Sequence, residues 1–288
     1  LTYAPNEPEY LITYLACAYA GFVFAPANVG FRRRELAYVC ANAEADVAVV
    51  HADVLDEFRN HIDGAPHAPR IIIVLAAPAD LELGAGMLRF DDLLRRGEAA
   101  VDPPAVIEPE DPLLICYTSG TTSAPKPVLH SHRSEVYNAT TYAQVWGFSP
   151  GDGGVVSMPL AWVYGLSTSS MALLAGGAKV VLRRRFQPVD LVRTIDAQGA
   201  TVTFGTMAMY NKMLEVMKDE PVDLSTLRLC VNGGEACTEA AVRSFEEATG
   251  LRLLQAYALS EARPVLAVDP RDSAAPRNGP YFFTASQK

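Results

Sequence analysis

The hydrophobic positions of the chain fall into short apolar runs that alternate with longer amphipathic stretches. Residues Glu7–Ala20 have the spacing of an amphipathic helix, whereas Val47–Val50 and Ile71–Leu75 have the unbroken apolar character of buried strands. Residues Pro78–Pro112 are rich in Pro, Gly and Ala and show poor periodicity, which predicts a connecting region.

Beyond this region the alternation becomes regular. The predicted strands are Leu113–Tyr117, Val155–Met158, Lys179–Leu182, Thr201–Phe204, Leu227–Val231 and Leu251–Tyr257. The predicted helices among them are Pro188–Gln198, Ala208–Lys218 and Thr238–Thr249. Strands punctuated by helices of about three turns indicate parallel βαβ units. The predicted fold class is therefore α/β, with mostly parallel sheets flanked by helices.

Polar, glycine and aromatic residues follow these strands. TSGTTSAPK comes after Tyr117, PLAWVYG after Met158, GTMAMY after Phe204, NGGEAC after Val231 and AYALSE after Gln255. Sheets of this kind bind their ligands at the carboxyl ends of the strands. We therefore expect the functional site at this edge.

Composition and charge narrow the class of protein. Half of the 288 residues are hydrophobic and a fifth are charged, which is typical of a soluble globular protein. The longest apolar runs are too short to span a membrane, and no basic leader precedes an apolar segment. The first residue is Leu1, so we expect the natural N-terminus to lie further upstream. A net charge of −9 disfavours nucleic acid and anionic membranes as partners. The clusters Arg32–Arg34 and Arg183–Arg185 are typical of solvated arginines.

Cysteine and histidine spacing gives no sign of a disulfide framework or a metal site. The five cysteines form no CxxC pair, and an odd number of thiols in apolar surroundings suits a reducing cytoplasm. His130 and His132 are two residues apart, with no cysteine or carboxylate ligand set beside them. We expect a cytoplasmic protein without a structural metal.

The stretch YTSGTTSAPKP, residues 117–127, carries the most informative chemistry. It has five Ser and Thr hydroxyl groups, one glycine, one lysine and no long aliphatic side chain. Gly120 lets the backbone approach a ligand, while the hydroxyls, the amides and Lys126 are donors suited to polyphosphate. A solvated Ser/Thr turn is the alternative for a hydroxyl cluster taken alone.

Two other motifs are excluded for this stretch. A Walker loop needs a second glycine before the lysine and a Ser or Thr after it, and both are absent. Ser123-Ala-Pro-Lys126 fits the S-x-x-K pattern of penicillin-binding proteins, but Pro125 disfavours the helical turn that this pattern needs. The partner motifs KTG and SDN occur nowhere in the chain.

YTSGTTSAPKPVLHSH resembles the phosphate-loop signature of the adenylate-forming superfamily, which includes acyl-CoA synthetases and aryl-CoA ligases. PLAWVYGL resembles the family's aromatic loop, TFGTMAMYNKML the segment lining the acyl pocket, VNGGEA the glycine loop beside adenine, and QAYALSE the adenylate loop. The first fifty residues resemble the family's N-terminal part. The chain is thus similar to the large N-terminal domain of that family. We expect a first portion over residues 1–112 and a phosphate-loop and adenylate-binding portion over residues 113–288.

The resemblance implies a reaction and its partners. The carboxylate of a small-molecule acid attacks the α-phosphate of ATP to give an acyl-adenylate and pyrophosphate, and the thiol of coenzyme A then displaces AMP. The expected cofactors and co-substrates are ATP, Mg²⁺ and coenzyme A. The other expected partner is either a second copy of the chain or a separate lid domain.

The resemblance also implies roles for residues. The β- and γ-phosphates would be held by Thr118, Ser119, Gly120, Thr121, Thr122 and Lys126. Tyr257 would lie against adenine, with Gly233, Gly234 and Glu235 on the adenine side of the pocket. The acyl pocket would be lined by Trp162, Tyr164, Gly165 and Gly205. Ser260 would bind the α-phosphate and Glu261 would hold Mg²⁺, so the catalytic residues implied are Lys126, Ser260 and Glu261.

Several positions depart from the family's pattern. Pro127 replaces the glycine after the lysine, Ala258 the glycine after the adenine-loop tyrosine, and Met207 the usual proline. No Tyr-x-Thr-Gly-Asp segment and no lid with its lysine follow Glu261, and residues 272–288 differ from the family's continuation. Losing such a transition-state contact costs on the order of 3 kcal/mol.

Three interpretations follow from the resemblance. The chain is the large N-terminal part of an acyl- or aryl-CoA ligase, a lidless module that binds nucleotide or acyl-adenylate, or an inactive fragment. Trp162, in place of a histidine, and the stretch GGEACTEAAVRSFEEATGLRLL are similar to the benzoate and aminobenzoate CoA-ligase branch. We therefore expect an aromatic, benzoate-like acid.

Overall fold

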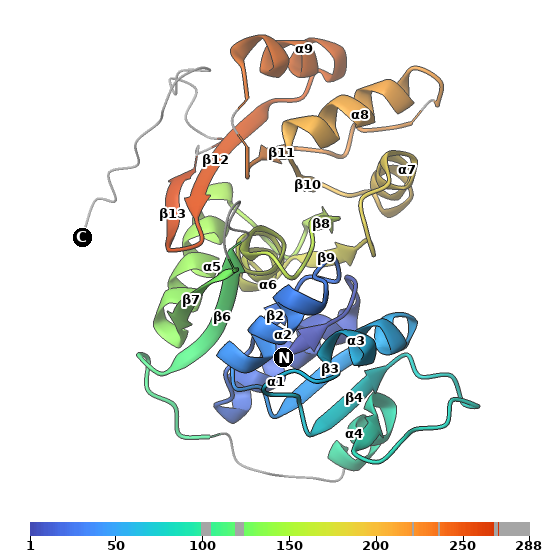
Figure 1. Ribbon diagram of the computed structural model, residues 1–288. Helices are drawn as coiled ribbons and strands as arrows, with labels where there is room; N and C mark the ends of the chain where they lie inside the picture. The colour runs from blue at the N-terminus through green and yellow to red at the C-terminus, as the bar shows by residue number, and fades with distance from the viewer. Residues whose placement is uncertain (99–104, 119–123, 221, 236, 268–269, 271–288) are drawn as a thin grey trace. The chain divides into compact units, whose positions relative to one another are not determined.

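The two larger sheets contain most of the short apolar strands that the sequence predicts, together with the unpredicted strands Thr2–Tyr3, Pro26–Ala27, Met87–Arg89 and Ala262–Ala267 (Figure 1). The structure is a computed structural model and describes residues 1–98, 105–118, 124–220, 222–235, 237–267 and 270. Leu1–Glu135 and Leu160–Trp162 form one compact unit, and Val136–Pro159 with the described residues from Val163 onward form a second. The expected division at residue 112 follows the motifs and stays a prediction.

The first unit contains a five-stranded parallel sheet in the order β2-β1-β3-β4-β5. Its strands are β1 (Thr2–Tyr3), β2 (Pro26–Ala27), β3 (Val47–His51), β4 (Ile71–Leu75) and β5 (Met87–Arg89). Its helices are α1 (Pro8–Ala20), α2 (Arg33–Asn42), η1 (Ala52–Val54), α3 (Leu55–Ile62) and α4 (Phe90–Gly97). An antiparallel hairpin of β6 (Pro112–Thr118) and β7 (Lys126–Ser131) completes the unit.

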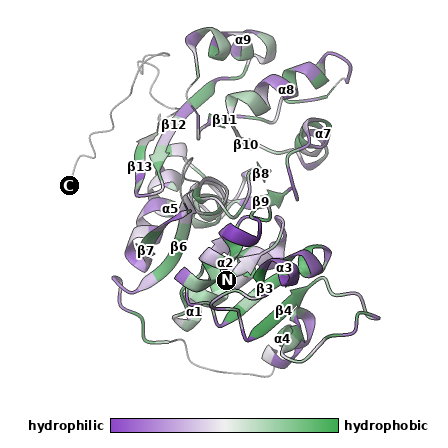
Figure 2. Cartoon of the chain, in the orientation of Figure 1, coloured by the Kyte–Doolittle hydropathy of each residue, from purple (hydrophilic) through white to green (hydrophobic). Residues whose placement is uncertain are grey.

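Apolar side chains of β1 and β3 pack beneath α2 and α3 in the first unit. The rings of Tyr3 and Phe58 lie 5.4 Å apart, and Leu36 of α2 is fully buried in the same cluster. The rings of Tyr10 and Tyr14 on α1 meet Phe24 edge-on. The strands β3 and β4 are hydrophobic along most of their length, as Figure 2 shows, because such parallel strands are covered on both faces.

The second unit contains a six-stranded sheet in the order β13-β12-β11-β10-β8-β9, parallel except for β13. Its strands are β8 (Gly153–Val156), β9 (Lys179–Leu182), β10 (Val202–Gly205), β11 (Leu229–Asn232), β12 (Leu253–Leu259) and β13 (Ala262–Ala267). Its helices are the π-helix η2 (Tyr164–Met171), α6 (Ala172–Ala175), α7 (Pro188–Gln198), α8 (Met207–Met217) and α9 (Glu239–Thr249). Helix α5 (His132–Trp146) begins in the first unit and continues in the second.

Both faces of this second sheet are covered by helices. Helices α7, α8 and α9 contribute Ile195, Tyr210 and Phe245 to one apolar cluster with the strands. On the other face, Phe204 of β10 meets the ring of Trp146 from α5 at 5.9 Å. This arrangement confirms the predicted α/β class with mostly parallel sheets flanked by helices.

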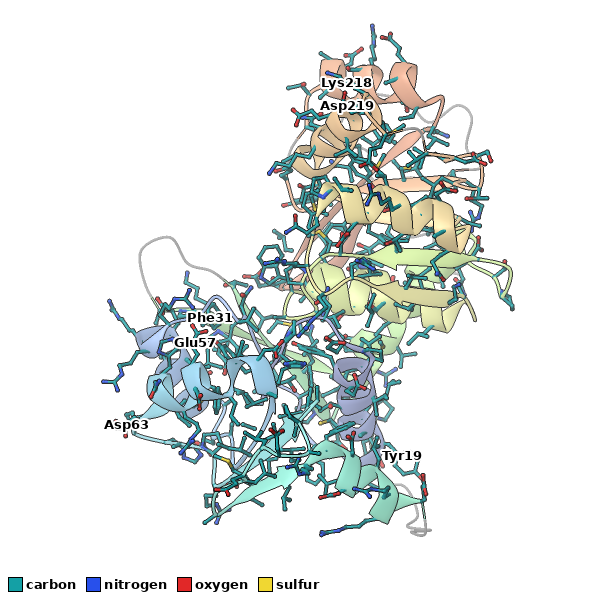
Figure 3. All side chains as sticks on the ribbon, turned by 90° about the vertical axis from the view of Figure 1, so that its right-hand side faces the viewer. Tyr19, Phe31, Glu57, Asp63, Lys218 and Asp219 are labelled. Atoms are coloured by element: carbon teal, nitrogen blue, oxygen red, sulfur yellow. The ribbon has the colours of Figure 1, made fainter. Side chains whose placement is uncertain are left out.

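Most charged side chains of the described residues lie outside these layers, with Asp152 and Glu135 as buried exceptions. Glu57 of α3 accepts a hydrogen bond from Arg32 at 2.7 Å, and both side chains are at least partly exposed to solvent. Figure 3 labels Glu57 together with Asp63, just after α3, and with Lys218 and Asp219, just after α8. Such exposed charges contribute little to stability, so the fold depends on the apolar layers.

The bounds of β4, β9 and α7 are those predicted from the sequence. The prediction of a connecting region over Pro78–Pro112 is wrong in part, because β5 and α4 lie within it. Strand β5 is only three residues long and forms because β4 offers it an edge to pair with. The Arg89 guanidinium then donates to four carbonyl oxygens of the preceding loop, those of Ala77, Pro78, Ala79 and Leu81.

Candidate functional site

Strands β10 and β11 of the second unit end at the same level, beside Gln255 of β12. In the register of the sheet, Gly205 of β10 is paired with Asn232 of β11, and Asn232 with Gln255 of β12. The amide of Gly233 then donates to the carbonyl of Gly205 at 3.1 Å. The loops that begin at Thr206 and Gly233 therefore start side by side, next to Ala256 of β12, at the edge where the sequence predicts the site.

Two tyrosines support the end of β11. The hydroxyl of Tyr164 lies 2.9 Å from the carbonyl oxygen of Val231 and 3.1 Å from that of Gly205, and donates toward both. The hydroxyl of Tyr210 also donates to Val231, at 2.9 Å, so both lone pairs of that carbonyl oxygen are used. Burial raises the pKa of Tyr164 well above its ordinary value, which keeps the hydroxyl protonated as a donor.

The glycine loop lies along the ring of Tyr164. A Cβ placed on Gly233 would lie 3.2 Å from Cζ of that ring and 3.4 Å from the carbonyl oxygen of Ala256. Gly234 has φ +82°, a conformation that residues with a side chain rarely adopt. Gly233 is therefore packed against Tyr164, whereas Gly234 is exposed and presents bare backbone that a ligand could approach closely.

Gly165 closes the base of the aromatic loop. A Cβ on Gly165 would lie 2.3 Å from the carbonyl oxygen of Pro159 and 2.7 Å from that of Met158, so no larger residue fits. The π-helix η2 begins at this point, and the hydroxyls of Ser169 and Ser170 donate to the carbonyl oxygens five residues earlier at 2.8 Å. Short π-helical turns of this kind are frequent at functional sites.

The tip of the aromatic loop belongs to the first unit. Leu160–Trp162 group with that unit, whereas Tyr164 and Gly165 belong to the second. The side chain of Trp162 is 48% exposed, which is unusual for so large an aromatic residue. The structure therefore brings together three of the four expected acyl-pocket positions, Tyr164, Gly165 and Gly205, within the second unit.

Glu235 has a contact that the sequence does not reveal. Its Oε1 accepts a hydrogen bond from the amide of Ala208 at 2.8 Å, in the first turn of α8. A carboxylate is favoured there because the first amides of a helix lack partners within the helix. The N-cap of α8 is Thr206, whose hydroxyl accepts from the Met209 amide at 3.4 Å. Glu235 thus connects the glycine loop to α8.

Replacing Glu235 by Ala is expected to lower the free energy of unfolding by about 1 kcal/mol, because the Ala208 amide loses its acceptor. Glu235→Gln keeps an acceptor oxygen and should lose less. Urea denaturation followed by circular dichroism measures both effects. Glu247→Ala, an exposed acidic residue on α9, is the matched control and should change stability little. Equal losses in all three variants would contradict the role of Glu235.

The adenylate-loop residues lie further along β12 than expected. The sequence predicts a strand ending at Tyr257, but β12 continues to Leu259 and pairs with β13. Strand β13 supplies the partner that β12 lacks beyond the end of β11, and Ser260 and Glu261 form the turn between them. Tyr257 is 49% exposed and follows Ala256, whose carbonyl faces Gly233. No contact of Ser260 or Glu261 with the glycine loop is seen in the described part of the chain.

The described phosphate-loop residues lie in the first unit. Thr118 is the last residue of β6 and Lys126 the first of β7, and the two are paired across the hairpin. The Thr118 hydroxyl donates to the carbonyl of Lys126 at 3.5 Å, and the Lys126 side chain is exposed. The other expected phosphate ligands, Ser119, Gly120, Thr121 and Thr122, lie outside the described residues.

Sequence reasoning missed the residues that support this edge. Tyr210, Thr206 and Ala256 are each in contact with the strand ends or the glycine loop. Only Thr206 carried a recognisable signal, since Thr before an amphipathic stretch is a typical N-cap. Tyr210 acts through the carbonyl of Val231, and Ala256 through the proximity of its own carbonyl to Gly233, so both depend on residues that are distant along the chain.

Neither a metal cluster nor a membrane helix is found in what the structure describes. No group of three or more His, Cys, Asp or Glu side chains among the described residues is arranged to hold a metal ion. None of the helices in that part of the chain is both long enough and apolar enough to cross a bilayer.

Comparison with known proteins places this geometry in context. The sequence model of a family described as AMP-binding enzyme matches residues 1–285. That match includes residues 272–285, so the likeness extends further than the motifs indicate. The chain is 31% identical over 272 residues to the indoleacetate–CoA ligase of Aromatoleum aromaticum, covering 93% of this chain and 51% of that protein. It is 26% identical over 285 residues to a long-chain-fatty-acid–CoA ligase of Bacillus subtilis, covering 91% and 50%.

Among solved structures, an anthranilate CoA ligase in complex with anthranoyl-AMP has the same fold, with a TM-score of 0.86. The two sequences are 23% identical, and the likeness covers 94% of this chain and 52% of that one. The chain thus spans about half the length of the relatives it matches.

Proposed function

The chain belongs to the AMP-binding enzyme family, as its motifs predict, and from this premise we propose that it forms the nucleotide- and acid-binding part of an acid–CoA ligase. In the proposed reaction, a carboxylate oxygen of the acid bonds to the α-phosphorus of ATP and the bond to pyrophosphate breaks. The thiol of coenzyme A then bonds to the acyl carbon of the adenylate, releasing AMP.

The glycine loop carries this proposal. Gly233 packs against the ring of Tyr164, and Gly234 beside it is exposed bare backbone. The next strand brings the half-exposed ring of Tyr257 one residue beyond the Ala256 carbonyl. A side-chain-free loop next to an exposed aromatic ring suits a flat purine, which stacks on the ring and approaches the backbone closely. Glu235 supports this loop through α8.

Phosphates and magnesium are assigned to other loops. Lys126 and the hydroxyls and amides of residues 118–122 would bind the β- and γ-phosphates, because an exposed lysine and several donors suit an anion. Ser260 would donate to the α-phosphate, and Glu261 would hold Mg²⁺, which would neutralise phosphate charge during the transfer. The exposed position of Glu261 on a two-residue turn leaves room for such ligands.

The acid is proposed to be aromatic. The half-exposed ring of Trp162 would offer flat apolar surface to an aromatic ring, and by the family resemblance Tyr164, Gly165 and Gly205 would line the same pocket. Indoleacetate in one relative's name and the anthranoyl group in one solved complex are consistent with this class, whereas the Bacillus relative is named for fatty acids.

Lys126→Ala is expected to weaken Mg-ATP binding by about tenfold, because a charged hydrogen-bond donor to phosphate is lost. AMP lacks the outer phosphates, so its affinity should change little. Isothermal titration calorimetry of the chain with each nucleotide measures the difference. Lys212→Ala, an exposed lysine on α8, is the matched control. Unchanged ATP affinity in Lys126→Ala would remove the phosphate role of this lysine.

The same titration tests the acid class with two non-hydrolysable adenylate mimics, one benzoyl and one hexanoyl. We expect the benzoyl mimic to bind about tenfold more tightly. Tighter binding of the hexanoyl mimic would overturn the aromatic assignment. Binding of neither mimic nor of ATP would count against the proposed function of the chain.

A further inference from the structure

Asn6 lies in the turn between β1 and α1, at the carboxyl end of β1. Its side chain is only 4% exposed, which is uncommon for an asparagine. The turn is held on both sides, since the Thr2 amide donates to Ala25 at 3.0 Å and the Tyr10 amide to Glu7 at 3.1 Å. Pro8 in the first turn of α1 restricts the backbone further. Asn6 is therefore fixed in position by its own surroundings.

The side chain of Asn6 holds a distant part of the chain. Its Oδ1 accepts a hydrogen bond from the amide of Leu160 at 2.8 Å, and this bond is buried. The two residues are 154 positions apart, and Leu160 is only 1% exposed. A buried amide without a partner is costly, so this bond strongly favours one position of the Leu160 backbone.

Leu160 begins the three-residue segment that ends at Trp162. The segment leaves the second unit after Pro159, and the chain returns to it at Val163. Because Gly165 closes the base of the loop against Pro159, the segment is held at its base and at Leu160. Among the residues that the structure describes, none makes a hydrogen bond with the Trp162 side chain, and Trp162 is 48% exposed.

We propose that Asn6 is a positioning residue, which sets the location of Trp162 through the Leu160 amide and thereby the affinity for the acyl group. The inference rests on the proposed function only in the role given to Trp162. Asn6 touches neither acid nor nucleotide in this account. Asn6 would affect the choice of acyl substrate indirectly, because the Trp162 ring lies two residues after the fixed Leu160 amide and therefore has little freedom to move.

A direct test uses the two tryptophans of the chain, Trp146 and Trp162. Trp146 is fully buried and Trp162 is half exposed, so acrylamide quenches chiefly Trp162. Asn6→Ala should increase the quenching, because the segment loses its anchor. Quenching in Trp162→Phe identifies the signal of Trp146 alone. Asn6→Asp keeps an acceptor for the Leu160 amide and should remain closer to the wild type than Asn6→Ala.

Asn28→Ala is the matched control. Asn28 also lies in the first unit, and its Oδ1 accepts from a backbone amide, that of Gly30 at 2.7 Å, in an exposed turn. It should leave Trp162 quenching unchanged. In calorimetry, Asn6→Ala should lower the affinity for the benzoyl-adenylate mimic by about tenfold, whereas the affinity for Mg-ATP should change by less than about twofold.

The outcomes separate this inference from the proposed function. Increased quenching in Asn6→Ala, with rescue by Asn6→Asp, supports the positioning role whether or not the chain binds a ligand. Unchanged quenching overturns it. Equal losses of ATP and mimic affinity, with a lower thermal midpoint, would indicate a general folding role and would also overturn it. Absence of ligand binding by the wild type counts against the proposed function alone.

Discussion

Asp152→Asn is expected to lower the free energy of unfolding by about 2–3 kcal/mol, because a buried carboxylate that accepts charged hydrogen bonds is lost while its partner Arg228 remains partly exposed to solvent. Asp152 is 6% exposed and directly precedes the first residue of β8. Arg228, just before β11, donates to both of its carboxylate oxygens, at 2.7 and 2.8 Å. The variant would leave the guanidinium without its counter-charge.

Other donors complete this cluster. The hydroxyl of Thr201 donates to Asp152 at 2.7 Å, and both the amide and the hydroxyl of Ser149 donate to it at 2.9 and 3.0 Å. Arg228 also donates to the carbonyls of Trp146 and Gly147. The cluster joins the end of α5 to the starts of β8, β10 and β11, so its loss should affect the whole second sheet.

The matched control has the same geometry on the surface. Arg193 donates to both carboxylate oxygens of Glu220, at 2.8 and 2.7 Å, but the arginine side chain is 64% exposed. Glu220→Gln should therefore cost at most about 1 kcal/mol. Urea denaturation of both variants provides the comparison. Similar losses would show that burial of Asp152 adds nothing.

The effect of Asp152→Asn should depend on pH. The hydrogen bonds from Arg228 hold the pKa of the Asp152 carboxyl well below its usual range, against the opposing effect of burial. A carboxyl with a lowered pKa in the folded state stabilises the protein above its unfolded pKa of about 3.9. This contribution is lost as the pH falls below that value toward the folded pKa. The stability difference between wild type and variant should shrink over that interval and stay constant above about pH 5.

Gly165→Ala is expected to have the second large effect, lowering the free energy of unfolding by about 3 kcal/mol. The new methyl group would lie 2.3 Å from the carbonyl oxygen of Pro159 and 2.7 Å from that of Met158. Both neighbours are backbone, so no side-chain rotation relieves the overlap. The base of the aromatic loop must then open, and binding of a benzoyl-adenylate mimic should be lost with it.

Gly151→Ala is the control for added volume, because its Cβ would meet only the Ser149 hydroxyl at 3.8 Å. Thermal unfolding and calorimetric titration on the two variants measure both effects. A Gly165→Ala protein with wild-type stability and mimic affinity would contradict the tight closure of this loop. Loss of affinity at full stability would instead place the effect in the pocket itself.

Much of the fold follows from local patterns in the sequence. The apolar runs that became β4 and β9, and the amphipathic stretch of α7, have the predicted bounds because Pro, Gly or polar residues border them. Elements with little buried surface were missed. In α4 only Phe90 is buried, and β5 is a three-residue strand that forms against an existing edge. Such elements depend on tertiary packing more than on their own propensity.

Part of the candidate site was likewise predicted from the sequence, and part depends on the tertiary structure. The motifs assign Tyr164, Gly165 and Gly205 to the acyl pocket and Gly233 to the adenine side, and the structure brings these four positions together in the second unit. The extension of β12 into a hairpin with β13 was not predicted, because AYALSE has the composition of a loop and gains its strand structure from pairing. The roles assigned to Lys126, Ser260 and Glu261 stay predictions.

The order of residue types along the chain was sufficient to indicate the fold class and the family. It could not indicate which distant groups bond to one another. Asn6 and Leu160 are 154 residues apart, Asp152 and Arg228 are 76, and Tyr164 and Val231 are 67. Periodicity reports which face of an element is apolar, and spacing reports local turns. A hydrogen bond of 2.8 Å between remote segments depends on how complete elements pack, and packing is set by all their side chains at once.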